Sequence, residues 1–405
     1  MGKRRLPENA LLEAVSLTEA LDLEVCAALV VPVAKPNAGE LFGSGKVAEL
    51  AALIEAEAVE LVIIDGPLSP IQQRNLEEKW QVKVLDRTGL ILEIFGARAA
   101  TREGVLQVDL AHLNYQKSRL VRSWTHLERQ RGAMGTVGGP GETQIESDRR
   151  AISDAIIRIR NQLEKVVKTR ALHRASRKKI PYPIVALVGY TNAGKSSIFN
   201  RLTGASVLEK DMLFATLDPT MRAIELPNGR KVILSDTVGF ISSLPTQLVA
   251  AFRATLEEVL DADLILHVRD ISHVDTKAQA EDVREILSSL GVKDEKASSM
   301  LEVWNKADLL PDAEREAMKT IAAREDQICM FSAITGEGTE ALYNKIEAGV
   351  AQSVIEENIL VGYANGKSRA WLFSNNLVLA EKQLDEGYQF SVRWTEKQRS
   401  QFARL

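Results

Sequence analysis

Short apolar runs alternate with helix-like stretches over the first hundred residues. From about Leu23 the chain reads EVCAALVV, KVAELAALIEA, VELVIID, PIQQRNLEEKW, VKVLD and GLILEIFGAR. Apolar runs of roughly four to eight residues are typical of strands, whereas apolar residues three and four apart are typical of one helix face. The alternation predicts a βαβαβα order, and we expect an α/β domain over residues 1–108.

Two later stretches carry a different pattern, with apolar residues spaced four and three apart. They are Leu106, Leu110, Leu113, Leu120, Trp124 and Leu127 in the first stretch, and Ile152, Ile156, Ile159, Leu163 and Val166 in the second. Between them stands RGAMGTVGGPGETQ, whose glycines are unfavourable in a helix. Two heptad stripes that face each other predict a helical hairpin over residues 109–180, with a flexible, glycine-rich tip.

The remainder of the chain returns to α/β patterning. Residues 181–351 alternate strand-like and helix-like runs, and we expect a second α/β domain there. Residues 352–405 predict a small C-terminal α/β domain, in which YQFSVRW is an alternating strand and EKQRSQFARL a short helix. Trp371 and Phe373 are expected in one short strand, as core residues or as platforms for a nucleic-acid base.

Composition indicates a globular protein of the cytoplasm. The 405 residues are 45% hydrophobic and 26% charged, enough for more than one core. No window approaches the roughly 18 to 20 apolar residues that span a bilayer, and the start lacks the apolar stretch of a signal peptide. Cys26 and Cys329 lie in apolar, strand-like runs, so we expect buried free thiols. A monomer is expected.

The net charge of −4 conceals an uneven distribution. Between Tyr115 and Ile180 there are 16 Lys and Arg against 6 Asp and Glu, a local balance of +10, so the remainder carries −14. A basic run is often only a solvated helix face. In an acidic protein, a run this concentrated favours a polyanionic partner instead.

The most informative motif is GYTNAGKS, which follows an apolar run and precedes a helix-like stretch. It matches G-x-x-x-x-G-K-[ST] in the strand-to-helix context of a P-loop. Glycines let backbone N–H groups wrap phosphates, Lys195 neutralises the β- and γ-phosphates, and Ser196 ligates Mg²⁺. We therefore expect nucleotide binding by Gly189, Tyr190, Thr191, Asn192, Ala193, Gly194, Lys195, Ser196 and Ser197.

A second motif, VILSDTVG, comes where a GTPase carries its second switch. It places Asp236 at a strand end, where the carboxylate can hold Mg²⁺ through water and Gly239 can donate its N–H to the γ-phosphate. The loop LFATLDPTMR, which precedes it, is rich in Thr and Asp. Thr216 is the expected switch threonine and third Mg²⁺ residue, with Thr220 as the rival, and Phe214 is expected at the nucleotide. A turn cap is the alternative role for Thr216.

The base is expected to be guanine. EVWNKADLL places Asn305, Lys306 and Asp308 after another strand, and the Asp308 carboxylate can accept two hydrogen bonds from guanine but not from adenine. MFSAITGEG supplies Ser332 and Ala333, whose backbone can meet guanine O6. In register with a P-loop, these motifs predict a GTPase, which converts GTP to GDP and phosphate.

The order GYTNAGKS, FATLDPT, DTVGF, NKAD and SAI, preceded by HLERQRGAMGTVGGPGETQIESDRR, resembles HflX-type GTPases of the Obg-HflX group. The resemblance covers roughly residues 20–405. It implies a multidomain α/β fold, with a P-loop GTPase domain whose mostly parallel sheet has flanking helices. It also implies association with the ribosome, a hairpin that approaches the peptidyl transferase centre of the large subunit, and a link to splitting ribosomes under stress.

The hairpin tip departs from the commoner family form, which carries an arginine just before GPGE. Here TVGGPGE supplies no charge between Arg131 and Glu142. We therefore expect contacts with rRNA phosphates from the flanking helices, at Arg122, Arg129, Arg131, Arg149 and Arg150. Solvent exposure with intrahelical ion pairs is the alternative for these arginines.

Phe240 stands after Gly239, where many GTPases carry a glutamine that orients the attacking water. Intrinsic hydrolysis is therefore expected to be slow, and the missing groups to come from the ribosome or from K⁺. Asn192 stands where several potassium-activated GTPases carry an asparagine ligand; loop hydrogen bonding is its alternative role. The expected catalytic residues are Lys195, Thr216, Gly239 and Asn192.

Two other functions stay open. One is a signalling GTPase whose protein partner docks on the hairpin as a coiled coil. The affinity of such helix packing would change little with salt concentration, whereas the affinity for RNA would fall steeply. The other is an ATP-dependent RNA remodeller that uses GELFGSGK in the N-terminal domain. That segment has Glu40 and Val47 where a Walker loop needs glycine and Ser or Thr, so a tight turn into a helix near Lys46 is favoured.

Overall fold

The computed structural model describes residues 6–131, 140–177, 182–205, 214, 220–242, 259–292, 299–350, 354–375 and 377–403. The side chains of residues 121–131, 140–145 and 167–177 also lie outside the description. The chain divides into two compact units, Met1–Leu342 and Tyr343–Leu405. Among the described helices, none is long and apolar enough to cross a membrane.

The first unit begins with a small α/β layer. Its elements are α1 (Pro7–Glu19), α2 (Ser44–Ala56), β1 (Leu61–Ile64), α3 (Pro70–Trp80), β2 (Lys83–Asp86) and α4 (Arg87–Arg98). Strands β1 and β2 pair in parallel, with Leu61 opposite Lys83. Helix α3 begins after a capping box, in which the Ser69 hydroxyl accepts from the Gln72 N–H and the Gln72 side chain accepts from the Ser69 N–H.

The stretch EVCAALVV, residues 24–31, belongs to no described strand, contrary to the βαβαβα expectation. Leu29 and Val30 in it are 50% and 46% exposed. Pro32 follows directly, and proline cannot donate to a strand ladder. The prediction of a buried Cys26 is also wrong, because Cys26 lies in this open stretch and is exposed, whereas Cys329 is buried as expected.

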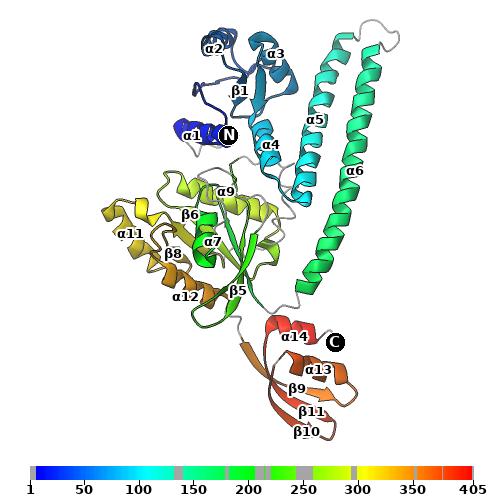
Figure 1. Cartoon of the computed structure of the whole chain (residues 1–405), viewed down its shortest axis with the longest axis vertical. Coiled ribbons are helices and arrows are strands. Elements are labelled where there is room, and N and C mark those ends of the chain that lie inside the picture. Colours follow the sequence, from blue (N-terminus) through cyan, green and yellow to red (C-terminus); the bar gives the residue numbers. More distant parts are fainter. Residues whose placement is uncertain are drawn as a thin grey trace. The chain divides into compact units, whose positions relative to one another are not determined.

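Two long helices follow, α5 (Arg102–Arg131) and α6 (Pro140–Arg177). They run side by side in opposite directions, and the base of α5 packs on α3 and α4 (Figure 1). Proline suits the first helical position, so α6 begins at Pro140 and Gly141 belongs to the helix. The remaining tip, residues 132–139, lies outside the described residues.

A six-stranded sheet forms the second α/β domain. Its elements are β3 (Ile184–Gly189), α7 (Lys195–Thr203), β4 (Thr220–Glu225), β5 (Lys231–Asp236), β6 (Leu264–Asp270), α9 (Thr276–Ser289), β7 (Leu301–Asn305), η1 (Ala307–Leu309), α11 (Asp312–Ala322), β8 (Ile328–Met330) and α12 (Thr339–Val350). The strand order is β4-β5-β3-β6-β7-β8, and only β4 runs antiparallel. The expected fold class, a mostly parallel sheet with flanking helices, is confirmed (Figure 1).

One apolar core joins the N-terminal layer to the second α/β domain. Helix α4 is buried along much of its length, and its residues belong to the same cluster as Val188, Tyr190, Phe214 and Phe240. The ring of Phe214 meets that of Phe95 on α4 edge-on, with centroids 4.6 Å apart. Helix α4 therefore contacts Phe214 and shares one core with the residues that follow β3 and β5.

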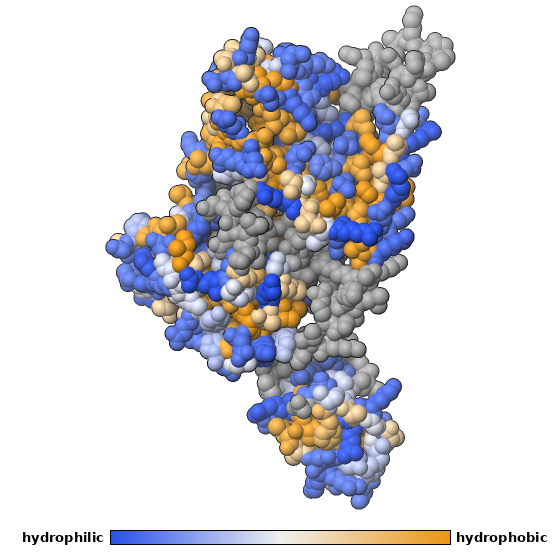
Figure 2. All heavy atoms as spheres, in the orientation of Figure 1, coloured by the Kyte–Doolittle hydropathy of each residue, from blue (hydrophilic) through white to orange (hydrophobic). Residues whose placement is uncertain are grey.

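The second unit is a three-stranded antiparallel sheet with two helices. Its elements are β9 (Val354–Gly362), α13 (Gly366–Ser374), β10 (Val378–Leu384), β11 (Gly387–Thr395) and α14 (Glu396–Phe402), with strand order β10-β11-β9. The prediction of a strand around Trp371 and Phe373 is wrong, because both lie on α13; an apolar run this short does not distinguish helix from strand. Trp371 packs on Phe402, whereas Phe373 is 46% exposed, and Figure 2 shows apolar residues on the visible face of this unit.

Candidate guanine nucleotide site

The motif residues gather at one edge of the sheet. The segments GYTNAGKS, DTVGF, NKAD and SAI follow β3, β5, β7 and β8, four strands that run parallel. Ligands of open α/β sheets bind at the carboxyl ends of such strands. The geometry therefore brings the motifs to one edge of the sheet, although Gly189 and Ser332 lie far apart in the sequence.

The P-loop backbone needs glycine at the start of α7. Gly194 has φ +88°, a conformation that L side chains rarely adopt, and a Cβ there would lie 2.1 Å from Asn305 Nδ2. At Gly239 a Cβ would lie 3.0 Å from the Thr191 Cα. These two glycines let the P-loop, the segment after β5 and the segment after β7 approach closely.

Lys195 is a buried ammonium at the centre of the site. It is 6% exposed, and its Nζ donates to the Tyr190 carbonyl over 2.9 Å. Burial lowers the pKa of Lys195 to about 8, and the nearby Asp236 carboxylate only partly opposes this. Because a polyphosphate would add negative charge beside the ammonium, the bound nucleotide would favour the charged form.

Ser196 and Asp236 present the oxygen donors that a hard cation prefers. The Ser196 hydroxyl donates to Asp236 Oδ2 over 2.8 Å, and Asp236 is fully buried at the end of β5. A hydroxyl, a carboxylate, phosphate oxygens and waters are the usual ligands of Mg²⁺ in nucleotide sites. The donor set therefore fits Mg²⁺.

Phe240 points into the apolar core. It is 1% exposed, its N–H donates to the Gly189 carbonyl over 3.1 Å, and its carbonyl accepts from the Thr191 N–H over 2.7 Å. The segment after β5 is thus joined to the P-loop by backbone hydrogen bonds on both sides of Tyr190. The aromatic ring takes no part in orienting water.

Asn305 braces two loops. It is 1% exposed, its Nδ2 donates to the Ala193 carbonyl over 2.9 Å, and its Oδ1 accepts from the Ala333 N–H over 3.0 Å. The predicted base-reading segments after β7 and β8 are therefore held at fixed positions relative to the P-loop. Ser332 is fully buried next to Ala333, and its hydroxyl accepts from the Thr335 N–H.

Asp308 has a carboxylate oxygen available for a ligand. It lies in η1, directly after Lys306, whose φ is +61° and whose Nζ pairs with Asp270 Oδ2 at 2.8 Å. Asp308 Oδ1 is buried and, within the described residues, has no hydrogen-bond partner. A buried acceptor without a partner is costly, so it fits a ligand with N–H donors such as guanine.

Sequence reasoning missed two supporting residues, Arg201 and Asp270. Arg201 on α7 donates through Nε to the Ala333 carbonyl over 2.5 Å, and a second nitrogen donates to the Ile334 carbonyl. Asp270 at the end of β6 holds Lys306. Neither residue lies in a recognisable motif, and only the fold brings them to the base-reading segments.

The remaining predicted site residues are partly described. Thr216 lies outside the described residues, whereas Thr220 begins β4 and Phe214 is buried against Phe95. Asn192 is exposed with φ +59°, and its side chain makes no hydrogen bond to the described residues. Ser197 is half-buried in the first turn of α7.

The proposed RNA contacts lie on the hairpin. Arg149 and Arg150 on α6 are exposed, and Arg150 pairs with Glu146 one turn away at 3.7 Å. Arg122, Arg129 and Arg131 fall on α5, where side chains lie outside the description. In the N-terminal layer, GSGK forms the start of α2, with Gly43 as N-cap and Ser44 as the first helical residue.

Four family descriptions match the chain in succession. Residues 8–96 match "GTP-binding GTPase N-terminal", residues 98–177 "GTP-binding GTPase Middle Region", residues 184–306 "50S ribosome-binding GTPase" and residues 317–405 "HflX C-terminal domain". The succession covers nearly the whole chain.

Known relatives also match the chain over most of its length. A GTPase HflX of Magnetococcus marinus is 50% identical over 380 residues, which cover 94% of this chain and 86% of the relative. A GTPase HflX of Escherichia coli is 41% identical over 372 residues, which cover 92% and 86%. A crystal structure of SsGBP with GDP has 26% identity and a TM-score of 0.50, covering 83% of this chain and 94% of that one.

Proposed function

The chain belongs to the HflX family of GTPases, and we propose that it acts on the ribosome, where the large subunit stimulates its hydrolysis of GTP and where it promotes separation of the subunits under stress. One matching family carries the description "50S ribosome-binding GTPase". Such a partner would place the protein in the cytoplasm.

The chain's own residues supply positioning and positive charge for phosphoryl transfer. Lys195 stabilises charge on the phosphates, and the Gly239 N–H contributes a donor to the γ-phosphate. Bound Mg²⁺, which Ser196 and Asp236 fit, would neutralise further phosphate charge. Asp308 selects guanine through Oδ1, which has no hydrogen-bond partner in the part of the chain that the structure describes.

The chain lacks a side chain that orients water after Gly239, since Phe240 is buried in the core. We therefore assign the completion of the site to the ribosome and to K⁺ at Asn192. Asn192 is exposed and has no side-chain hydrogen bond to the described residues, so its oxygen is available to a cation. Turnover measured in KCl and in NaCl at equal ionic strength should differ by about tenfold or more in favour of KCl. Equal rates would remove K⁺ from the account.

The observation that carries the ribosomal assignment is the charge of the hairpin. The segment from Tyr115 to Ile180 has a balance of +10 in a chain of net charge −4. Arg149 and Arg150 are exposed on α6, and their charges can reach a polyanion. RNA phosphates are the polyanion that this arrangement fits, because clustered Arg and Lys release counterions from the phosphate backbone and so strengthen binding.

Binding to purified large subunits at several salt concentrations tests the assignment. The logarithm of the affinity should fall steeply and linearly with the logarithm of the salt concentration. The double variant Arg149→Ala, Arg150→Ala should bind more weakly and reduce the slope by roughly 0.7 to 0.9 for each lost phosphate contact.

A matched control removes two exposed charges outside the hairpin. Lys277→Ala with Arg324→Ala changes the net charge equally, and both residues are exposed in the GTPase domain. Its affinity and slope should stay near those of the unsubstituted protein. Binding that is insensitive to salt would instead favour a protein partner docked on the hairpin by helix packing.

A further inference from the structure

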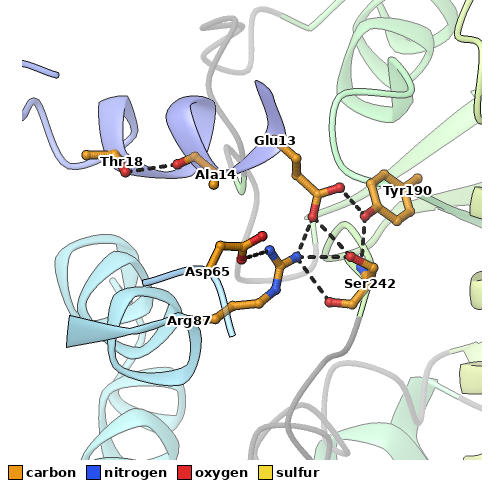
Figure 3. Close-up of polar contacts among 7 residues, drawn as sticks. All are labelled: Glu13, Ala14, Thr18, Asp65, Arg87, Tyr190 and Ser242. Atoms are coloured by element: carbon orange, nitrogen blue, oxygen red, sulfur yellow. Dashed lines mark hydrogen bonds and ion pairs between the residues drawn. The ribbon is translucent and has the colours of Figure 1, made fainter. Parts of the chain in front are cut away.

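Arg87 of the N-terminal layer contacts the segment of the GTPase domain that follows the DTVGF motif (Figure 3). It is the first residue of α4, and one of its nitrogens donates to both the carbonyl and the hydroxyl of Ser242, each over 3.1 Å. Ser242 lies three residues after Gly239, in the segment that follows the DTVGF motif. The same nitrogen donates to the carboxylate of Glu13 on α1, and the other terminal nitrogen pairs with Asp65 at 2.5 Å.

Glu13 closes the network onto the P-loop. The Tyr190 hydroxyl donates to Glu13 Oε2 over 2.6 Å and accepts from the Ser242 N–H over 2.8 Å (Figure 3). The Ser242 hydroxyl also donates to Glu13 Oε1 over 3.1 Å. Tyr190 is the second residue of the P-loop, and its carbonyl accepts from Lys195. One arginine and one carboxylate therefore hold both nucleotide loops.

The network is buried, which makes its geometry specific. Arg87 is 7% exposed and Tyr190 5%. Burial by itself would lower the pKa of Arg87, but the carboxylates of Asp65 and Glu13 more than offset this and raise it. A buried charge that loses its partner is strongly destabilising, so Arg87, Glu13 and Asp65 favour one arrangement over displaced ones.

The preceding residue, Asp86, holds the hairpin. It is 3% exposed and caps α4 by accepting from the Gly89 N–H over 2.8 Å. On α5, the Tyr115 hydroxyl donates to the same carboxylate over 2.6 Å, and Arg119 pairs with its other oxygen. Asp86 and Arg87 are consecutive residues of the N-terminal layer. Asp86 thus joins this layer to the hairpin, and Arg87 joins it to the nucleotide loops.

Taking the proposed ribosomal function as its premise, we propose that Asp86 and Arg87 couple the hairpin to the nucleotide loops, with Arg87 as a positioning residue for the P-loop and the second switch. A shift of Ser242 when the γ-phosphate binds Gly239 is passed through Arg87 to the start of α4. Asp86 passes it to Tyr115 and Arg119 in the middle of α5. Thermodynamic linkage is reciprocal. If bound nucleotide changes the free energy of docking the hairpin, docking of the hairpin changes the free energy of nucleotide binding by the same amount.

Hydrogen exchange in the isolated protein tests this coupling without a ribosome. We expect the amides of residues 110–120 to exchange at rates that differ roughly fivefold or more between the GDP complex and the complex with a non-hydrolysable GTP analogue, the scale of ordinary coupling energies. Both nucleotides are used at saturating concentration, so a weakened affinity does not alter the comparison.

Variants that remove single hydroxyls identify the route. The double variant Tyr190→Phe, Ser242→Ala removes the hydroxyl contacts with Glu13 and Arg87, while the aromatic ring and the bond from Arg87 to the Ser242 carbonyl remain, and it should reduce the difference at residues 110–120. Tyr115→Phe removes one of the two hairpin contacts of Asp86 and should reduce the difference as well, with affinity for GDP unchanged. Replacing Arg87 itself would remove the positive charge beside the partly buried carboxylates of Glu13 and Asp65 and endanger folding.

Thr18→Val is the matched control. Thr18 lies on α1 with Glu13, and its hydroxyl donates only to the Ala14 carbonyl of the same helix, over 2.9 Å (Figure 3). This variant should keep the full difference between the two nucleotides. No difference in the unsubstituted protein, or a difference that is undiminished in both the double variant and Tyr115→Phe, would overturn the coupling. Because no ribosome is present, that outcome is separate from failure of the large subunit to bind.

Discussion

At the scale of single residues, we propose that Asp308 selects the base that is bound. Its buried Oδ1 has no hydrogen-bond partner among the described residues, so a guanine would satisfy it. Asp308→Asn replaces one acceptor with a donor and should lower the affinity for GDP roughly 100-fold or more, since a hydrogen bond to a charged group contributes about 1.5–3 kcal/mol. Fluorescence titration with a labelled GDP measures this loss.

The control for that substitution is Asp312→Asn. Asp312 is exposed at the start of α11, and its amide variant should keep the affinity for GDP. If Asp308→Asn binds GDP as well as the unsubstituted protein does, the base is read elsewhere. Preserved hydrolysis of ATP by Asp308→Asn would support a second nucleotide site in the N-terminal layer.

Phe240 is the other informative residue. Phe240→Gln introduces a glutamine where many GTPases carry the one that orients water, yet the side chain at this position points into the core and is 1% exposed. Burying an amide there without partners costs about 1–3 kcal/mol. We expect a lower melting temperature and less than a threefold change in intrinsic turnover, whereas Phe240→Leu should keep most of the stability. A gain of tenfold or more in Phe240→Gln would show that position 240 faces the nucleotide.

Residue types could be assigned from the sequence where a motif fixes their chemistry. Lys195, Ser196, Asp236, Asn305 and Asp308 all reach the edge of the sheet that their motifs predicted. The network of Arg87 and Glu13 could not be predicted, because its members lie up to 229 residues apart and belong to no motif. Cys26 was misassigned for a related reason, since an apolar run does not reveal whether a partner strand covers it.

At the scale of elements, long periodic segments were predicted better than short ones. The two heptad stripes correspond to α5 and α6, and the strand before GYTNAGKS corresponds to β3. The run EVCAALVV forms no described strand, and the run around Trp371 forms helix α13. In both cases tertiary contacts, rather than local preference, decide the conformation.

The turn between β3 and α7 gives a prediction about backbone geometry. Gly194→Ala places a Cβ at φ +88°, where it would also lie 2.1 Å from Asn305 Nδ2. We expect a loss of about 1–2 kcal/mol in unfolding free energy from the backbone conformation, together with a loss of GDP binding. Thermal unfolding and nucleotide titration measure the two effects separately.

Gly204→Ala is the control at the other end of α7. Gly204 has φ +63°, and a Cβ there would meet nothing within 4 Å. Gly194→Ala should lose more stability than Gly204→Ala, because only its Cβ meets Asn305, and only Gly194→Ala should lose nucleotide affinity. Equal GDP affinities in the two variants would contradict the role assigned to the close approach of Asn305.

At the scale of the whole chain, the first unit combines three functional parts. The basic hairpin can meet a polyanion, the sheet edge can bind GTP, and the N-terminal layer contacts both through Asp86 and Arg87. The second unit has its own core around Phe390 and Trp394, and its described residues include none of the predicted nucleotide residues. This division fits the proposal that a partner stimulates catalysis, because the hairpin, which we propose as the partner surface, is separate from the sheet edge proposed to bind the nucleotide.

The most direct test measures steady-state GTP hydrolysis with and without purified large ribosomal subunits, at fixed Mg²⁺ and K⁺. We predict slow turnover by the isolated protein and a rise of roughly a hundredfold or more with large subunits. Activating partners of other GTPases raise turnover by roughly 10³- to 10⁵-fold. A rate unchanged by large subunits would contradict the claim that the ribosome supplies what Phe240 cannot.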